Sequence, residues 1–167
     1  MTEKIYRSYL EIKSIGELKE VNVPSKRYFI EIANPKDFQL NKFFYKNIGK
    51  NCQWTDRLVW TDLNWIDYIS NDQLFTYTLK DKDQIAGYFE MLFNKQTKEA
   101  EIAYFGILEA YYGKKLGGYL LSEAIKNSFN MGCERVWLHT CSLDHENALK
   151  NYLSRGMKIF KSETLTR

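Results

Sequence analysis

Three apolar segments joined by short polar turns constrain the fold of this chain most strongly. The segments are residues 74–79 (LFTYTL), 85–94 (IAGYFEMLFN) and 99–108 (EAEIAYFGIL), and the turns between them contain DKDQ and KQTK. Segments rich in β-branched and aromatic residues between polar turns are typical of strands. Because turns this short join antiparallel neighbours, the pattern predicts a three-stranded β-meander.

Helical and extended patterns lie on both sides of this meander. Upstream, alternation predicts a strand at 27–34, and capped apolar stripes predict helices at 37–49 and 61–70. Downstream, apolar residues recur at helical spacing over 117–131, and a strand (RVWLHT), a helix at 144–156 and a last strand (MKIF) follow. This order predicts an α/β (α+β) fold in which one mixed, largely antiparallel sheet has helices on both faces.

The composition indicates one soluble domain, which we expect to cover residues 1–167, with residues 1–25 as a peripheral N-terminal extension. Hydrophobic residues make up 44% and charged residues 27% of the chain, as in globular rather than disordered proteins. The formal net charge is only +3 and the lysines are scattered, so we expect no nucleic-acid partner.

The cysteines and the apolar segments bear on location. The sequence contains three cysteines, Cys52, Cys133 and Cys141, and none of them has CxxC spacing. An odd number of cysteines fits a disulfide framework poorly and favours a reducing compartment. No segment approaches the roughly 20 apolar residues of a membrane span. The first residues also lack an apolar signal core. We therefore expect a cytoplasmic protein with no membrane association, and we expect no metal ion.

A glycine-containing turn, YYGKKLGG, precedes the helix predicted at 117–131. The first N–H groups of a helix have no partner within the helix, and its dipole makes that end positive. Glycines let the backbone approach a ligand closely, so the turn has the features of a phosphate or pyrophosphate site. The GxxxxGK[ST] and GxGxxG patterns are absent, and similar turns occur without a ligand. On the turn alone, an anion site and a plain loop remain equal alternatives.

The turn and the C-terminal helix together resemble the Gcn5-related N-acetyltransferase (GNAT) family, which transfers acyl groups from coenzyme A thioesters. The family pattern V-x-P-x-Y/F-R/Q-G-x-G-x-G is matched at Tyr111, Gly113 and Gly117. Lys115 replaces the middle glycine, and Tyr112 replaces the Arg or Gln. Two further positions differ, with Ile107 in place of the valine and Glu109 in place of the proline.

The second half of the resemblance lies in the helix at 144–156. The family pattern D-N-x-x-A-x-x-x-Y-x-x-x-G-F is matched at Asp144, Ala148, Tyr152 and Gly156, while His145 replaces the asparagine. The resemblance covers about residues 85–160, which it identifies as the cofactor-binding core, and it extends to a bacterial subgroup of acetyltransferases. It implies an acyl-CoA N-acyltransferase-like fold, acetyl-CoA as the cofactor and an amine as the acceptor.

The resemblance also implies which residues contact acetyl-CoA. In the family the pyrophosphate is held mostly by backbone N–H groups of the turn, so lysine at 115 removes no donor. Its Cβ must still be accommodated, which is easy if the helix has begun by Lys115, and the two lysines then add a screened attraction. The expected cofactor contacts are Phe105, Ile107, Tyr112, Gly113, Lys114, Lys115, Leu116, Gly117, Gly118, His145, Ala148 and Tyr152.

The resemblance names a general acid, and the residues suggest three candidate bases. Tyr152 is the expected proton donor to the leaving thiolate, and the alternative is a packing tyrosine. Glu101 is the first candidate for the general base, on the face that strand alternation shares with Phe105 and Ile107. Glu90 is the second candidate for the general base and His139 is the third. Both glutamates could instead lie near strand ends in solvent, and His139 could be structural.

The acceptor site is expected between the first two helices and the meander. Trp54 and Tyr104 are candidate substrate contacts, and we include Glu90 and His139 with them. If the two rings line the pocket, a flat or cationic acceptor fits. The TDR sequence ending at Arg57 could orient a charged group or form a surface salt-bridge cluster.

These observations favour an acetyl-CoA-dependent N-acetyltransferase that acts on the amine of a small molecule or amino acid by direct attack. Two alternatives remain, a non-catalytic acyl-CoA-binding regulatory module and a protein or peptide N-acetyltransferase. Because relatives are often dimers, the resemblance also allows a homodimer.

Overall fold

The computed structural model describes residues 3–166, in which seven strands form one sheet in the order β2-β3-β4-β5-β6-β1-β7. The strands are β1 (Lys4–Ile12), β2 (Tyr28–Ile32), β3 (Leu74–Asp81), β4 (Gln84–Asn94), β5 (Glu99–Ile107), β6 (Arg135–Cys141) and β7 (Lys158–Thr166). The helices are η1 (Ile15–Glu17), α1 (Phe38–Gly49), α2 (Asp62–Ile69), η2 (Glu109–Tyr111), α3 (Leu116–Asn130) and α4 (Ala148–Ser154). Residues 1, 2 and 167 of the predicted domain lie outside the described residues.

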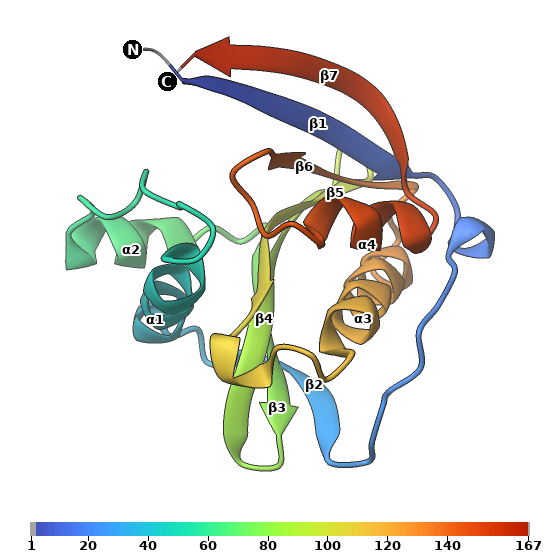
Figure 1. Cartoon of the computed structure of the whole chain (residues 1–167). Coiled ribbons are helices and arrows are strands. Elements are labelled where there is room, and N and C mark those ends of the chain that lie inside the picture. Colours follow the sequence, from blue (N-terminus) through green and yellow to red (C-terminus); the bar gives the residue numbers. More distant parts are fainter. Residues whose placement is uncertain (1–2, 167) are drawn as a thin grey trace.

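The helices cover both faces of the sheet, which confirms the predicted fold class (Figure 1). The pairing is antiparallel throughout except between β5 and β6, and β3, β4 and β5 form the predicted meander. The larger apolar core lies between the sheet and α3 and includes Phe89, Met91 and Leu120. A second cluster of Phe44, Ile48, Cys52 and Tyr88 lies under α1.

Local capping explains where the first two helices begin. The Asp37 side chain accepts a hydrogen bond from the Gln39 N–H at the start of α1. Thr61 and Asn64 form a capping box at the start of α2, each side chain accepting from the other's backbone N–H. By contrast, α4 begins only at Ala148 with Asn147 as its cap, so the expectation of a helix starting at Asp144 is wrong.

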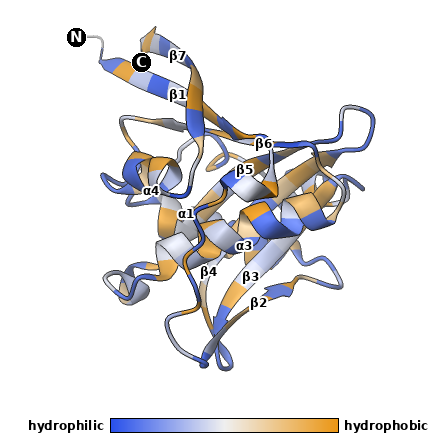
Figure 2. Ribbon diagram, turned by 90° about the vertical axis from the view of Figure 1, so that its right-hand side faces the viewer, coloured by the Kyte–Doolittle hydropathy of each residue, from blue (hydrophilic) through white to orange (hydrophobic). Residues whose placement is uncertain are grey.

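The N-terminal strand is part of the sheet, so the expectation that residues 1–25 are peripheral is wrong for β1. This strand lies between β6 and β7 and pairs with both of them. Its residues Leu10 and Ile12 are buried in the larger core. Figures 1 and 2 show β1 and β7 extending together beyond the rest of the molecule. Within residues 3–166, no helix is long and apolar enough to cross a membrane.

Two irregularities in β5 shape the centre of the molecule. Its parallel pairing with β6 covers only Glu99–Glu101 against Arg135–Trp137, after which no pairing follows. Its pairing with β4 shifts by one residue at Ala103, which is a β-bulge. Because side chains alternate along a strand, the bulge changes which residues share a face. Together the two features open the sheet where the candidate site lies.

Candidate active site

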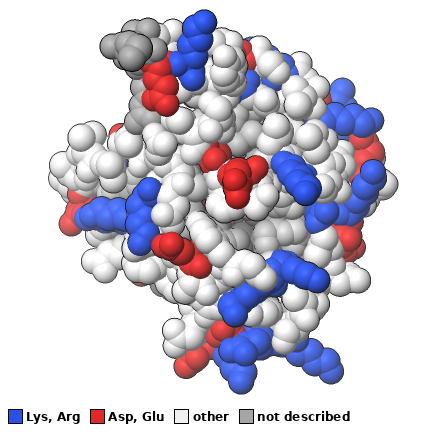
Figure 3. Space-filling model, in the orientation of Figure 1, with Lys and Arg blue, Asp and Glu red and all other residues white. Residues whose placement is uncertain are grey.

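A cavity of about 1040 Å³ lies where β5 and β6 are no longer paired. Its walls come from the loop after α1, from β5, from the turn before α3, and from the loop between β6 and α4. Figure 3 shows a hollow near the centre of this face, with basic and acidic side chains interspersed around it. A cavity of this size can hold an extended ligand together with a second, smaller molecule.

The turn before α3 supplies free backbone donors to this cavity. The helix begins at Leu116, and no side chain caps its N-terminus. Leu116, Gly117 and Gly118 line the cavity, so the uncapped end of α3 faces it. An uncapped helix N-terminus favours an anionic ligand through its N–H groups and its dipole.

Lys115 adopts a conformation that glycine ordinarily takes. It is the N-cap of α3, with φ 63° and ψ 27° in the left-handed region. The helix has therefore not begun at Lys115, so the condition under which its Cβ would be accommodated easily is not met. Lysine at this position accepts backbone strain where the family pattern has a glycine, because its Cβ crowds the following carbonyl oxygen. Its side chain is exposed, as expected.

Replacing Lys115 with glycine is expected to raise the free energy of unfolding by about 1 kcal/mol, because glycine adopts the left-handed region without strain. Urea unfolding measures the change. The matched control is Lys114→Gly, since Lys114 is not among the positive-φ residues and gains no relief. The control is expected to lose up to about 1 kcal/mol. Equal losses in both variants would contradict the strain argument.

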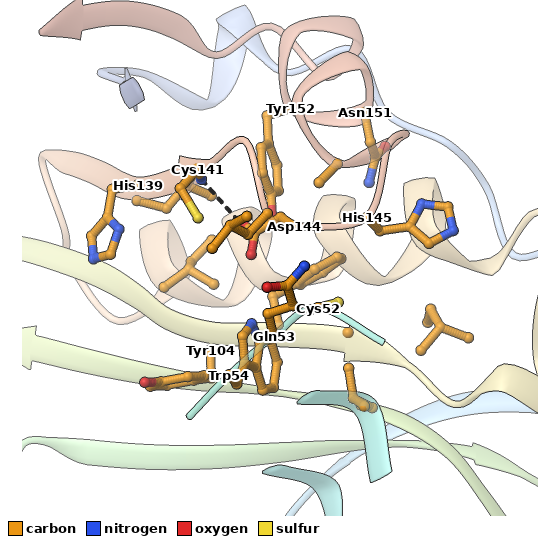
Figure 4. A pocket seen from close by; sticks show the side chains of 18 of the residues that line it. Cys52, Gln53, Trp54, Tyr104, His139, Cys141, Asp144, His145, Asn151 and Tyr152 are labelled. Carbon is orange, nitrogen blue, oxygen red and sulfur yellow. Dashed lines mark hydrogen bonds between the residues drawn. The ribbon is translucent and has the colours of Figure 1, made fainter. Parts of the chain in front are cut away.

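Tyr152 extends from α4 into the cavity beside Asp144 (Figure 4). It is 7% exposed, and its ring lies 6.1 Å from the Phe105 ring, centroid to centroid. Burial, and secondarily the Asp144 charge, raises the pKa of Tyr152, so its hydroxyl stays protonated. Asp144 itself holds the loop, because its carboxylate accepts hydrogen bonds from the Thr140 hydroxyl and the Cys141 N–H.

Other contacts fix α4 against the turn. The Asn151 amide donates a hydrogen bond of 3.1 Å to the Gly117 carbonyl, a link that the sequence reasoning missed. The His145 ring packs edge-on against Tyr112, with centroids 5.2 Å apart. All but one of the predicted cofactor contacts line the cavity, the exception being Lys114. Those lining it are Phe105, Ile107, Tyr112, Gly113, Lys115, Leu116, Gly117, Gly118, His145, Ala148 and Tyr152.

Glu101 also lines the cavity, but on the other side of the sheet from Phe105 and Ile107. Ile102, Phe105 and Ile107 face α3, whereas Tyr104 packs with the α1 cluster. The bulge at Ala103 therefore overturns the expected shared face. Glu101 is half-buried, and burial raises its pKa, while the Arg57 charge lowers it by a smaller amount.

Glu90 lies beneath the cavity rather than in it. It is completely buried and is not among the lining residues, which contradicts both a substrate contact and a solvent position. Its carboxylate accepts hydrogen bonds from Tyr68 at 2.6 Å, Asn41 at 2.8 Å and Arg57 at 3.3 Å. These three donors compensate for the loss of hydration, so Glu90 is a structural charge.

Arg57 is the buried partner of Glu90 and is enclosed by aromatic rings. It is 8% exposed, so a surface salt-bridge cluster is not what the structure contains. Its guanidinium carbon lies 4.1 Å from the ring centroids of both Tyr68 and Tyr104. Three further rings surround it at 4.7 to 5.7 Å, those of Trp60, Trp65 and Tyr45. Cation–π contacts of this kind are strongest where water is excluded.

The predicted acceptor residues differ in how they meet the cavity. Trp54 and Tyr104 both line it and pack edge to face, with centroids 4.9 Å apart. One face of Tyr104 is covered by Arg57, so that face cannot receive a cationic acceptor. His139 lines the cavity from β6 (Figure 4), and its ring lies 5.5 Å from Tyr9. His139 is exposed, yet reduced hydration at the cavity wall and the nearby Arg7 charge lower the pKa of His139, so the ring is neutral near pH 7.

The chain is similar to known proteins in sequence and in fold. A protein-family model described as the acetyltransferase (GNAT) family matches residues 37–157. No curated protein matches the sequence. Within residues 3–166, no group of His, Cys, Asp and Glu side chains is placed to hold a metal ion.

Solved structures share the fold at low identity. A GCN5-related N-acetyltransferase from Sphaerobacter thermophilus is 14% identical with a TM-score of 0.71, over 97% of this chain and 50% of that one. A GCN5-related N-acetyltransferase from Kribbella flavida is 12% identical with a TM-score of 0.68, over 99% of this chain and 58% of that one. This chain thus spans only about half the length of these two proteins.

A third similar structure is an aminoglycoside acetyltransferase from an uncultured soil metagenomic sample, in complex with trehalose. It is 13% identical with a TM-score of 0.65, over 78% of this chain and 88% of that one. At such identities the likeness supports the acyl-CoA N-acyltransferase fold alone. The family model, however, covers more than half of the sequence, and the chain therefore belongs to the acetyltransferase (GNAT) family.

Proposed function

We propose that this protein is an acetyl-CoA-dependent N-acetyltransferase that acts on the amine of a small molecule or an amino acid. One observation carries the proposal: the uncapped N-terminus of α3 opens into the same cavity as Tyr152 and Glu101. The N–H groups of Leu116, Gly117 and Gly118 suit a pyrophosphate, and the cavity volume of about 1040 Å³ leaves room for the arm that follows it. The free thiols of Cys52, Cys133 and Cys141 fit a cytoplasmic location. A homodimer stays a prediction.

The chain's own residues supply the proton transfers. Acetyl-CoA, when bound, supplies the acetyl group as a thioester. Glu101 accepts a proton from the acceptor amine, directly or through water, while the nitrogen bonds to the acetyl carbon. Tyr152 donates its hydroxyl proton to the sulfur as the carbon–sulfur bond breaks. The raised pKa of Glu101 strengthens it as a base, and that of Tyr152 means that its hydroxyl carries a proton at neutral pH.

Calorimetric titration with acetyl-CoA and thiol release with a panel of amines test this function. We expect binding at micromolar to millimolar cofactor and thiol release that depends on an amine. No binding at millimolar cofactor would overturn the proposal. Binding without release across the panel would favour a non-catalytic regulatory module instead.

Removing the two lysines of the turn is expected to weaken acetyl-CoA binding only modestly. Lys114 and Lys115 are both exposed, so each contributes a screened attraction. The Lys114→Ala, Lys115→Ala variant should bind roughly threefold to tenfold more weakly, and its affinity should depend less on salt. Calorimetry at two salt concentrations measures both effects. Complete loss of binding would show that the backbone donors are not the main contacts.

The pH dependence of the rate tests Glu101. A base works only when deprotonated, so kcat/KM should fall as the pH drops through the raised pKa of Glu101. Glu101→Gln should lower kcat/KM by about 10²-fold and abolish that acid limb. The control is Glu99→Gln on the same strand, which is not in the cavity and should keep the limb. An unchanged profile in Glu101→Gln would assign the base elsewhere.

A further inference from the structure

Two arginines line the cavity on the acceptor side, and they differ in how well their charges are compensated. Arg57 is enclosed by rings and paired with the buried Glu90. Arg7 comes from β1, where it pairs in register with Cys141 of β6. Leu10 and Ile12 of β1 face the core, so alternation places Arg7 on the opposite face, together with His139.

The charge of Arg7 is only partly compensated within the described residues. Its Nη1 lies 3.5 Å from a Glu163 oxygen, and that same oxygen accepts a 2.7 Å hydrogen bond from the Tyr9 hydroxyl. The Nε of Arg7 is buried without a hydrogen-bond partner. One third of the side chain is exposed, and the residue lines the cavity. The terminal nitrogens of Arg7 are therefore able to receive a further anionic group.

Carboxylates that could bind the amine of an acceptor lie on the same side of the cavity, on β5 and in the loop after α1. Glu101 lines the same cavity on the same face of the sheet, and Asp56 lines it from the loop after α1. Trp54 and Tyr104, which pack against each other, add ring surfaces to the same cavity. The acceptor side thus presents a guanidinium, carboxylates and aromatic surface, which together complement a molecule with an amine, a carboxylate and an apolar side chain.

We infer that Arg7 binds a carboxylate of the acceptor, and that the acceptor class is therefore amino acids rather than simple amines. The inference rests on the proposed function. Arg57 does not serve this purpose, because its guanidinium is occupied by Glu90 and covered by rings. Lys115 lies in the turn before α3, at the expected cofactor end. Arg7 is a specificity-determining residue in this assignment.

Matched acceptor pairs that differ only in the carboxylate test the inference. Suitable pairs are phenylalanine with phenethylamine, tryptophan with tryptamine, and lysine with cadaverine. We expect the wild type to favour the acid over its amine by at least about tenfold in kcat/KM, since the amine leaves the partly buried Arg7 guanidinium without the carboxylate that would bind it. Arg7→Gln should abolish this preference through a higher KM for the acid, and Arg7→Lys should retain part of it.

Arg135→Gln is the matched control. Arg135, on β6, is paired with Glu11 of β1 and Glu99 of β5, and it does not line the cavity. Its loss should therefore leave the preference for the acid intact. Equal use of acid and amine by the wild type, or equal losses for both in Arg7→Gln, would overturn the inference while leaving the acetyltransferase function standing.

A binding measurement separates this inference from the proposed function. Phenylalanine and phenethylamine are titrated by calorimetry into the wild type and Arg7→Gln, with and without coenzyme A. Acid-selective binding that depends on Arg7 supports the inference even without turnover. Absence of such selectivity in the presence of bound coenzyme A contradicts it, whereas failure of coenzyme A itself to bind contradicts the proposed function.

Discussion

Replacing Tyr152 with phenylalanine is expected to lower kcat by about 10²-fold or more while acetyl-CoA binding changes little. The substitution removes only the hydroxyl, and the ring still packs against Phe105. Burial raises the pKa of Tyr152, so the hydroxyl that the substitution removes is protonated at neutral pH and can donate to the leaving sulfur. Steady-state thiol release measures kcat, and calorimetry measures cofactor binding.

The control for this experiment is Tyr119→Phe. Tyr119 is buried to a similar degree in the same apolar core but lies outside the cavity, so kcat should stay near the wild-type value. If Tyr152→Phe retains full kcat, Tyr152 is a packing residue and another group protonates the sulfur. Loss of binding and kcat together would indicate a role in shaping the cavity.

Replacing Arg57 with methionine is expected to lower the free energy of unfolding by about 3 to 5 kcal/mol. The change leaves the completely buried Glu90 carboxylate without its charge partner, with only the Tyr68 and Asn41 hydrogen bonds remaining. It also leaves five rings packed around a smaller and uncharged side chain. Urea or thermal unfolding measures the loss.

A double-mutant cycle shows whether the loss comes from the unpaired charge. Adding Glu90→Gln to Arg57→Met removes that charge, so the double variant should recover part of the stability. Glu134→Gln breaks the exposed pair with Lys98 and should change stability by less than about 0.5 kcal/mol. A double variant as unstable as the sum of the two single variants would contradict a direct Arg57–Glu90 interaction.

Much of the fold could be predicted from the sequence because its signals are local. The alternating apolar segments and short turns define the meander, and the Asp37 and Thr61 caps lie within three residues of their partners. The glycine-containing turn and Tyr152 were selected as candidate site residues from two short motifs that match the family pattern, and their roles stay predictions. Each of these signals depends on neighbouring residues and backbone preference, which the order of amino acids specifies directly.

The failed predictions depend on contacts between distant residues. Glu90 looked like a solvent or substrate carboxylate, yet its partners Arg57 and Asn41 lie 33 and 49 positions away along the chain. The first strand looked peripheral because its partner strands begin more than 120 residues later, at Arg135 and Lys158. The bulge at Ala103 is set by pairing with β4, so no pattern within β5 could reveal it.

The sequence by itself determined most of the order of strands and helices, and it identified the glycine-containing turn and Tyr152 as candidate site residues, because periodicity, capping and short motifs operate over a few residues. Only the tertiary structure decided that Glu101 rather than Glu90 faces the cavity, that Arg57 is buried among rings, and that Arg7 lines the same cavity. These outcomes depend on strand pairing and burial, which involve residues far apart in the sequence. Local sequence preferences do not distinguish a buried position from an exposed one for these charged residues, but burying a charge without a partner costs free energy, and this cost excludes the other arrangements.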